Sequence, residues 1–134
     1  MILPIILLFA HANTNSYNLT NVESCLSGSA IKLYSISFDN FPVPGNYLKF
    51  TLKAEIIQPV FVDTIIVELT GNAFSRQEEF NVCVPPGPYS PLDFSESIQV
   101  ANYNQESYNM QIYIGNCFEY FSCYQLRFGI WKNL

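Results

Sequence analysis

The chain has 134 residues, a formal net charge of -5 and 13% charged residues against 49% hydrophobic ones. Its six basic residues are scattered without forming a cluster, which argues against nucleic-acid binding, because that function needs grouped Lys and Arg side chains. The length suits a single domain built around one hydrophobic core and leaves no room for a second domain.

The N-terminus has the pattern of a secretory signal peptide. An apolar run from Ile2 to Phe9 is followed by Ala10-His11-Ala12, a small-x-small cleavage site. The run is far shorter than the ~20 apolar residues that span a bilayer. We therefore expect residues 1–12 to be a signal peptide, in a protein that is secreted or resides in the endolysosomal lumen.

Residues 13–24 are expected to form an N-terminal arm ahead of the folded domain, residues 25–134. Asn18-Leu19-Thr20 in this arm is a glycosylation sequon, so Asn18 is a predicted glycosylation site.

The rest of the chain consists of short segments with the sequence pattern of β-strands, separated by turns. In residues 48–56, Leu48, Phe50 and Leu52 alternate with polar residues, which is typical of a strand with one buried face. Similar patterns, with turn signals between them, predict seven strands: 30–38, 48–56, 61–69, 73–82, 94–101, 108–114 and 122–131. The polar segment 73–82 is expected to be an edge strand.

Residues 84–91 hold four prolines, which are excluded from a sheet interior, so we expect a long loop there. No segment shows a 3.6-residue period. The predicted fold is all-β: an immunoglobulin-like antiparallel β-sandwich of about seven strands.

Four cysteines in a secreted chain most simply form two disulfides, and three pairings are possible. Zinc binding is disfavoured, because the chain has no Cys-x-x-Cys pair and its single histidine, His11, lies in the expected signal peptide. Loss of that histidine also removes Ser-His and Cys-His catalytic systems. We expect no enzymatic activity and no cofactor.

The chain resembles the ML family, the MD-2-related lipid-recognition domains, and most of all its phosphatidylglycerol/phosphatidylinositol transfer and Niemann-Pick type C2-like branch. The order and spacing of several features carry the resemblance: Cys25 followed by Gly28, the strand with Ile31, Leu33 and Ile36, Pro42-x-Pro44-Gly45 leading into Leu48-x-Phe50, Cys83 after the fourth strand, Pro86-Gly87-Pro88-Tyr89, and Cys123 in the last strand.

This resemblance implies two sheets around an apolar cavity that holds a sterol, a phospholipid or a glycolipid, and an outer disulfide between Cys25 and Cys123. The inward faces supply the candidate lipid-binding residues: Phe50, Leu52 and Ile56; Ile65, Val67 and Leu69; Ile98 and Val100; Met110, Ile112 and Ile114; Leu126, Phe128 and Ile130. The alternative is that these residues fill a closed core.

The chain departs from the family pattern at its other cysteines, since Val84-Pro85 stands where the family has a second cysteine close after the first. We expect Cys83 to pair with Cys117, on the argument that the last three strands are successive neighbours. That arrangement would bring the end of the fourth strand and the final hairpin to one end of the sandwich.

The expected function is lipid binding or transfer by a monomer that contacts membranes transiently. Aromatic and proline residues in three loops, residues 41–44, 85–91 and 118–121, are candidates for the cavity mouth and for membrane contact. The alternative is a secreted protein-interaction module, either an adhesion domain or a lipid-presenting co-receptor, to whose surface Trp131 would belong.

Overall fold

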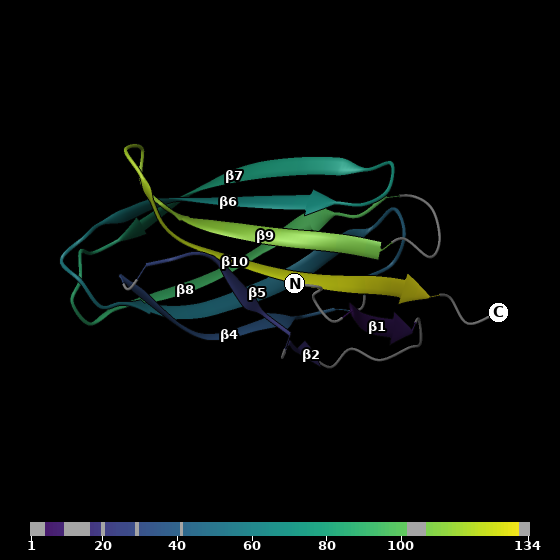
Figure 1. Cartoon of the computed structure of the whole chain (residues 1–134), viewed down its shortest axis with the longest axis horizontal. Helices are drawn as coiled ribbons and strands as arrows, with labels where there is room; N and C mark the ends of the chain where they lie inside the picture. The colour runs from purple at the N-terminus through teal and green to yellow at the C-terminus, as the bar shows by residue number, and fades with distance from the viewer. Residues whose placement is uncertain are drawn as a thin grey trace.

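The computed structural model describes residues 5–9, 17–19, 21–28, 30–40, 42–101 and 107–131, with backbone alone for 5–9, 17–18 and 130–131 (Figure 1). These residues contain strands and no helix, so no helix that could cross a membrane occurs among them. The strands are β1 (Ile5–Phe9), β2 (Tyr17–Asn18), β3 (Glu23–Leu26), β4 (Ile31–Phe38), β5 (Tyr47–Ile56), β6 (Val62–Thr70), β7 (Ser75–Val84), β8 (Ser90–Gln99), β9 (Ser107–Gly115) and β10 (Tyr120–Trp131).

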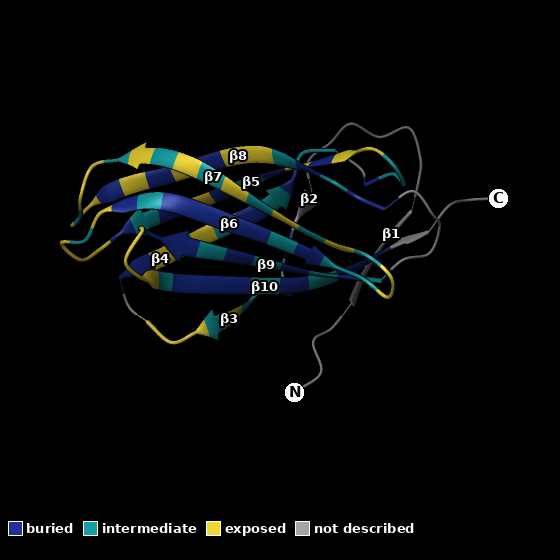
Figure 2. Ribbon diagram, turned by 90° about the horizontal axis from the view of Figure 1, so that it is seen from above, coloured by how far each residue is buried: buried dark blue, intermediate teal, exposed yellow. Residues whose placement is uncertain are grey.

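The strands form two facing sheets (Figures 1 and 2). The first, sheet A, has the order β1-β10-β9-β6-β7, with β3 also paired to β10. The second, sheet B, has the order β2-β4-β5-β8. Every pairing is antiparallel except that of β1 with β10. The predicted all-β sandwich is therefore confirmed.

Side-chain alternation explains why the two sheets face each other. Along β5 the even-numbered residues from Leu48 to Ile56 are buried, and the odd-numbered ones face solvent or are half-buried. On the outer face Lys53 stands opposite Asp93 of β8, a cross-strand pair of opposite charges. Burying one apolar face of each sheet against the other removes both faces from water and forms a single core.

Aromatic contacts close one end of this core. Phe38 of sheet B meets Phe128 of sheet A edge to face, with ring centroids 5.0 Å apart. Tyr108 stacks on Phe128 at 5.2 Å, and Phe74 packs edge-on against Tyr108 at 6.0 Å. Phe128, one of the predicted lipid-binding residues, therefore packs against other aromatic side chains at this end of the core.

The proline-rich loop is shorter than predicted. It comprises residues 85–89, because β7 continues to Val84 and β8 already begins at Ser90. Pro91 lies inside β8, where it pairs with Glu55. A proline is tolerated there because β8 is an edge strand, which uses only one side of its backbone for pairing.

The predicted relation of the last three strands is only partly correct. β9 and β10 are neighbours, but β8 pairs with β5 in the opposite sheet. Alternation assigns a face to each residue and does not assign a partner to each strand.

The N-terminal segments add strands to both sheets. β1 lies beside residues 127–131 of β10 and falls within the predicted signal peptide, whose removal remains a prediction. β2 is an edge strand of sheet B and contains Asn18, whose side chain lies outside the described residues. Glycosylation of Asn18 likewise remains a prediction.

A disulfide joins Cys25 of β3 to Cys123 of β10, as the family resemblance implies. The predicted pairing of Cys83 with Cys117 is wrong, because both thiols are free and exposed. β6 separates β7 from β9, which places these two strands about 9–10 Å apart, and Cys117 lies beyond β9 in the turn to β10. A disulfide needs Cα atoms within about 7 Å.

Removing the Cys25–Cys123 bridge is expected to destabilise the fold strongly. Its cysteines are 98 residues apart, and chain entropy alone gives about 4–5 kcal/mol for a closed loop of that size. A C25S/C123S variant should lose at least about 2 kcal/mol of unfolding free energy in denaturant titrations. The matched C83S/C117S variant should change it by less than about 0.5 kcal/mol. A large loss in this control variant would contradict the free state of Cys83 and Cys117.

Candidate functional site

The predicted lipid-binding residues meet in one apolar cluster between the sheets. Thirteen of them are exposed by 2% or less and belong to this cluster: Phe50, Leu52, Ile56, Ile65, Val67, Leu69, Ile98, Val100, Met110, Ile112, Ile114, Leu126 and Phe128. The side chain of Ile130 lies outside the described residues. In this structure these side chains pack against one another, and the pocket described next is lined by a different set.

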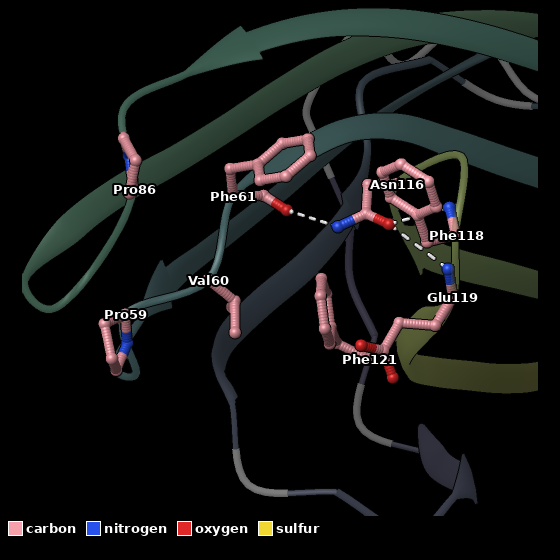
Figure 3. A pocket seen from close by; sticks show the side chains of 8 residues that line it. All are labelled: Pro59, Val60, Phe61, Pro86, Asn116, Phe118, Glu119 and Phe121. Carbon is pink, nitrogen blue, oxygen red and sulfur yellow. Dashed lines mark hydrogen bonds between the residues drawn. The ribbon is translucent and has the colours of Figure 1, made fainter.

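An apolar pocket of about 450 Å³ is shown in Figure 3. It lies at the end of the sandwich opposite the Phe38–Phe128 contact, because β5 ends and β10 begins beside it. Its volume falls within the ~300–1,000 Å³ range of small-molecule sites. Six of its lining residues are apolar and two are polar: Pro59, Val60, Phe61, Pro86, Phe118 and Phe121, with Asn116 and Glu119.

Three connections between strands build this pocket. The β5–β6 crossover, residues 57–61, passes from sheet B to sheet A, and the β9–β10 hairpin, residues 116–119, faces it. The β7–β8 loop adds Pro86. Figure 3 shows Val60 and Phe121 reaching toward each other from opposite walls. Both side chains also pack against the core cluster, so the floor of the pocket is continuous with the interior of the sandwich.

Asn116 holds two of the pocket walls together. Its side-chain Nδ2 donates to the carbonyl oxygen of Phe61 at 3.1 Å, which links the hairpin to the crossover. Its Oδ1 accepts hydrogen bonds from the backbone N–H groups of Phe118 and Glu119 at 2.9 and 3.2 Å. The Asn116 side chain is buried, with 8% exposure, so these bonds form largely away from solvent.

Glycine allows the close backbone approaches at this end. Gly87 donates its N–H to the carbonyl of Val60 at 3.2 Å, and a Cβ at position 87 would collide with the backbone carbonyl of Gln58. A Cβ at Gly28 would likewise meet the carbonyl oxygen of Phe121. Larger residues at these positions would push the surrounding segments away from the pocket.

Exposed apolar side chains gather around the pocket. Among the described residues, eight large hydrophobic side chains are exposed, and six of these lie in or beside the segments at this end: Leu26, Ile57, Phe61, Tyr89, Phe118 and Tyr120. Phe118 and Tyr89 are the most open, at 83% and 81%. We call these six residues the apolar tip. Tyr34 and Tyr47, the other two, lie on β4 and β5.

The three loops singled out in the sequence separate in space. Residues 85–91 and 118–121 both contribute to the pocket. Residues 42–44 lie at the opposite end, where the neighbouring Gly45 donates its N–H to the carbonyl of Ala101 at 2.9 Å. Phe41 lies outside the described residues.

Sequence reasoning missed Pro59, Val60 and Phe61 as pocket residues. The sequence places Phe61 at the start of the predicted strand 61–69 and leaves Pro59 and Val60 in the gap before it, although the apolar run Pro59-Val60-Phe61 carried a signal. An exposed apolar connection between two strands indicates an interaction surface or a ligand-binding site.

A seam runs along the side of the sandwich where β7 and β8 form the edges of their sheets. No residue of β7 is buried, and its inward side chains Phe80, Val82 and Val84 are only half-buried (Figure 2). Phe80 contacts Phe94 of β8 at 5.4 Å between ring centroids. The two edges therefore meet through side chains and not through backbone pairing.

Other kinds of site are less developed in the described part of the chain. A smaller polar hollow of about 200 Å³ lies at the other end, between residues 70–72 and the start of β9. The described residues contain no group of three or more His, Cys, Asp or Glu side chains placed to hold a metal ion.

Comparison of the chain with models of known protein families and with curated protein sequences found no match.

Weakening the Asn116 link should loosen the pocket walls. Asn116→Ala removes three hydrogen bonds, and we expect an unfolding free energy lower by about 1–3 kcal/mol, measured in denaturant titrations. Asn116→Asp keeps the acceptor for Phe118 and Glu119 but sets a buried carboxylate oxygen against the carbonyl oxygen of Phe61, so its loss should be at least as large. Equal stability of Asn116→Ala and the unmodified protein would contradict the conclusion that Asn116 holds the pocket walls together.

Proposed function

We propose that this protein binds a membrane lipid and carries it between membranes, without chemical conversion, as a secreted or endolysosomal protein of the ML type. The disulfide between Cys25 and Cys123 and the two-sheet fold are what the resemblance to that family implies. A largely buried disulfide of this kind is compatible with an extracellular or lumenal location. The ligand class, by the same resemblance, is a sterol, a phospholipid or a glycolipid.

The observation that carries this proposal is an apolar pocket that opens within the apolar tip. An exposed apolar patch on a protein usually marks a contact site, and a pocket inside such a patch suits a ligand that itself leaves an apolar phase. The lining holds no histidine, cysteine or basic residue. The site is thus suited to bind an apolar group and not to catalyse a reaction.

The thermodynamics of such a site favour exchange. Burial of a sixteen-carbon chain is worth roughly 12 kcal/mol relative to water, at about 0.8 kcal/mol per methylene. Relative to a bilayer the gain is close to zero, since both environments are apolar. A carrier of this kind takes up and releases its ligand easily at a membrane and retains it in water.

The pocket floor suggests how a long lipid chain is accommodated. Val60 and Phe121 lie between the pocket and the core, so a chain that displaces them reaches the predicted lining residues. We propose that the sheets then part along the β7–β8 seam. Because no side chain of β7 is fully buried there, that side should be the less costly one to open.

The apolar tip is proposed to contact the membrane during exchange. Phe118 and Tyr89 are almost fully solvent-exposed, and aromatic rings settle readily at a membrane interface. The described residues of the loops at this end, 57–61, 85–89 and 116–119, contain one charged side chain, Glu119. Docking should therefore depend on apolar contact more than on attraction to anionic lipids.

Native mass spectrometry of protein purified from its natural source tests the proposed function. We expect an added mass that is released by organic solvent and identified as a lipid. Protein that is uniformly empty and instead forms dimers or holds a protein ligand would favour the alternative, a secreted interaction module that uses the same apolar tip as its interface.

Membrane contact through the apolar tip is tested by replacing its two most exposed aromatic residues. F118S/Y89S should slow lipid transfer between vesicles about tenfold, the factor that corresponds to ~1.4 kcal/mol of lost apolar contact. Y34S/Y47S is the matched control, because it removes two exposed aromatic side chains away from the apolar tip and should leave the rate unchanged. Equal rates for both variants would rule out docking through this end.

A further inference from the structure

The polar groups of the pocket carry information about the head group of its ligand. Asn116 and Glu119 are the two polar lining residues. The Asn116 Oδ1 already accepts from the N–H groups of Phe118 and Glu119, and its Nδ2 donates to the carbonyl of Phe61, which leaves one N–H on a side chain that is only 8% exposed. Glu119 is exposed and is thus the more accessible polar side chain for a ligand.

The Glu119 carboxylate faces the pocket. Figure 3 shows its side chain extending from the hairpin in the direction of Phe121, and both residues line the pocket, at which Glu119 is open to solvent. The ion pair found in the described part of the chain joins Arg76 and Glu78 on β7, so Glu119 has no cationic partner there. The backbone of Glu119 is engaged with Asn116, which fixes the position from which the side chain extends.

No positive charge balances this carboxylate at the apolar tip. The connections that build the pocket, residues 57–61, 85–89 and 116–119, and the first two residues of β10 contain no Lys, Arg or His. An ionised carboxylate only accepts hydrogen bonds. A ligand that covers it without donating a hydrogen bond incurs the cost of removing it from water, and an anionic head group is also repelled.

We propose that the ligand of this pocket has a head group that donates hydrogen bonds and carries no negative charge, an alcohol or an amine, and that Glu119 selects for it. This inference rests on the proposed lipid-binding function and narrows its ligand class. Lipids that present a free carboxylate or an exposed phosphate next to the tail are disfavoured at this site. Glu119 acts here as a specificity residue, while the apolar lining supplies the affinity.

Three amphiphiles with one tail and different heads test this inference: dodecylamine, dodecanol and dodecanoate, used below their micellar concentrations at pH 7.5. Binding is measured by displacement of a neutral fluorescent naphthylamine probe. We expect dodecylamine and dodecanol to bind more tightly than dodecanoate, by about three- to fivefold, the range of a charge interaction near a protein surface. The preference for the amine over dodecanoate should diminish as salt is raised.

Variants of Glu119 separate its charge from its shape. Glu119→Gln should bring the three affinities together, and Glu119→Lys should make dodecanoate the tightest ligand. Glu79→Gln is the matched control, because Glu79 is an exposed residue of β7 outside the pocket and its loss changes net charge equally. The control should keep the order found for the unmodified protein.

The outcomes distinguish this inference from the proposed function. Saturable binding of all three amphiphiles with equal affinity, or an order that Glu119→Lys leaves unchanged, overturns the role of Glu119 and leaves lipid binding in place. Absence of saturable binding for all three overturns both the lipid-binding function and the inference that rests on it.

Discussion

The mutual burial of one apolar face from each sheet is the interaction on which the rest of this structure depends. Strands such as β5 and β9 carry apolar side chains on alternate positions, so each sheet has one face that must leave water. The two faces satisfy this requirement by covering each other. The outer faces carry mostly polar residues, and the connections lie at the two ends of the sandwich.

The two ends of the sandwich are closed by different groups, and this difference determines where the pocket lies. At one end Phe38 and Phe128 meet across the sheets and fill the space between them. At the other end the crossover at residues 57–61 and the hairpin at residues 116–119 approach each other through Asn116 without filling the space between them. A pocket therefore lies at the end where connections, rather than core side chains, form the walls.

The proposals for this protein assign three tasks to that one end. The apolar tip would contact a membrane, the pocket would admit an apolar tail, and Glu119 would discriminate between head groups. These tasks are compatible because they use different properties of the same few connections: exposure, shape and charge. The core behind them would supply additional apolar surface once the sheets part along the β7–β8 seam.

A large share of the fold was predictable because strand periodicity is a local property. The alternation around Phe50 and around Ile112 identified strands and the face that each buries, and glycine and proline marked the connections between them. The all-β sandwich follows from these local patterns. The lipid-binding hypothesis came from the family resemblance and remains a proposal.

The sequence by itself determined which segments form strands and which residues face inward, because neighbouring residues of a strand point to opposite sides whatever the strand pairs with. Only the tertiary structure decided the order of strands, and with it the placement of β8 beside β5 and the free state of Cys83 and Cys117. It also decided that residues 59–61 and 116–121 share one pocket. These features depend on contacts between distant segments, which no local pattern specifies.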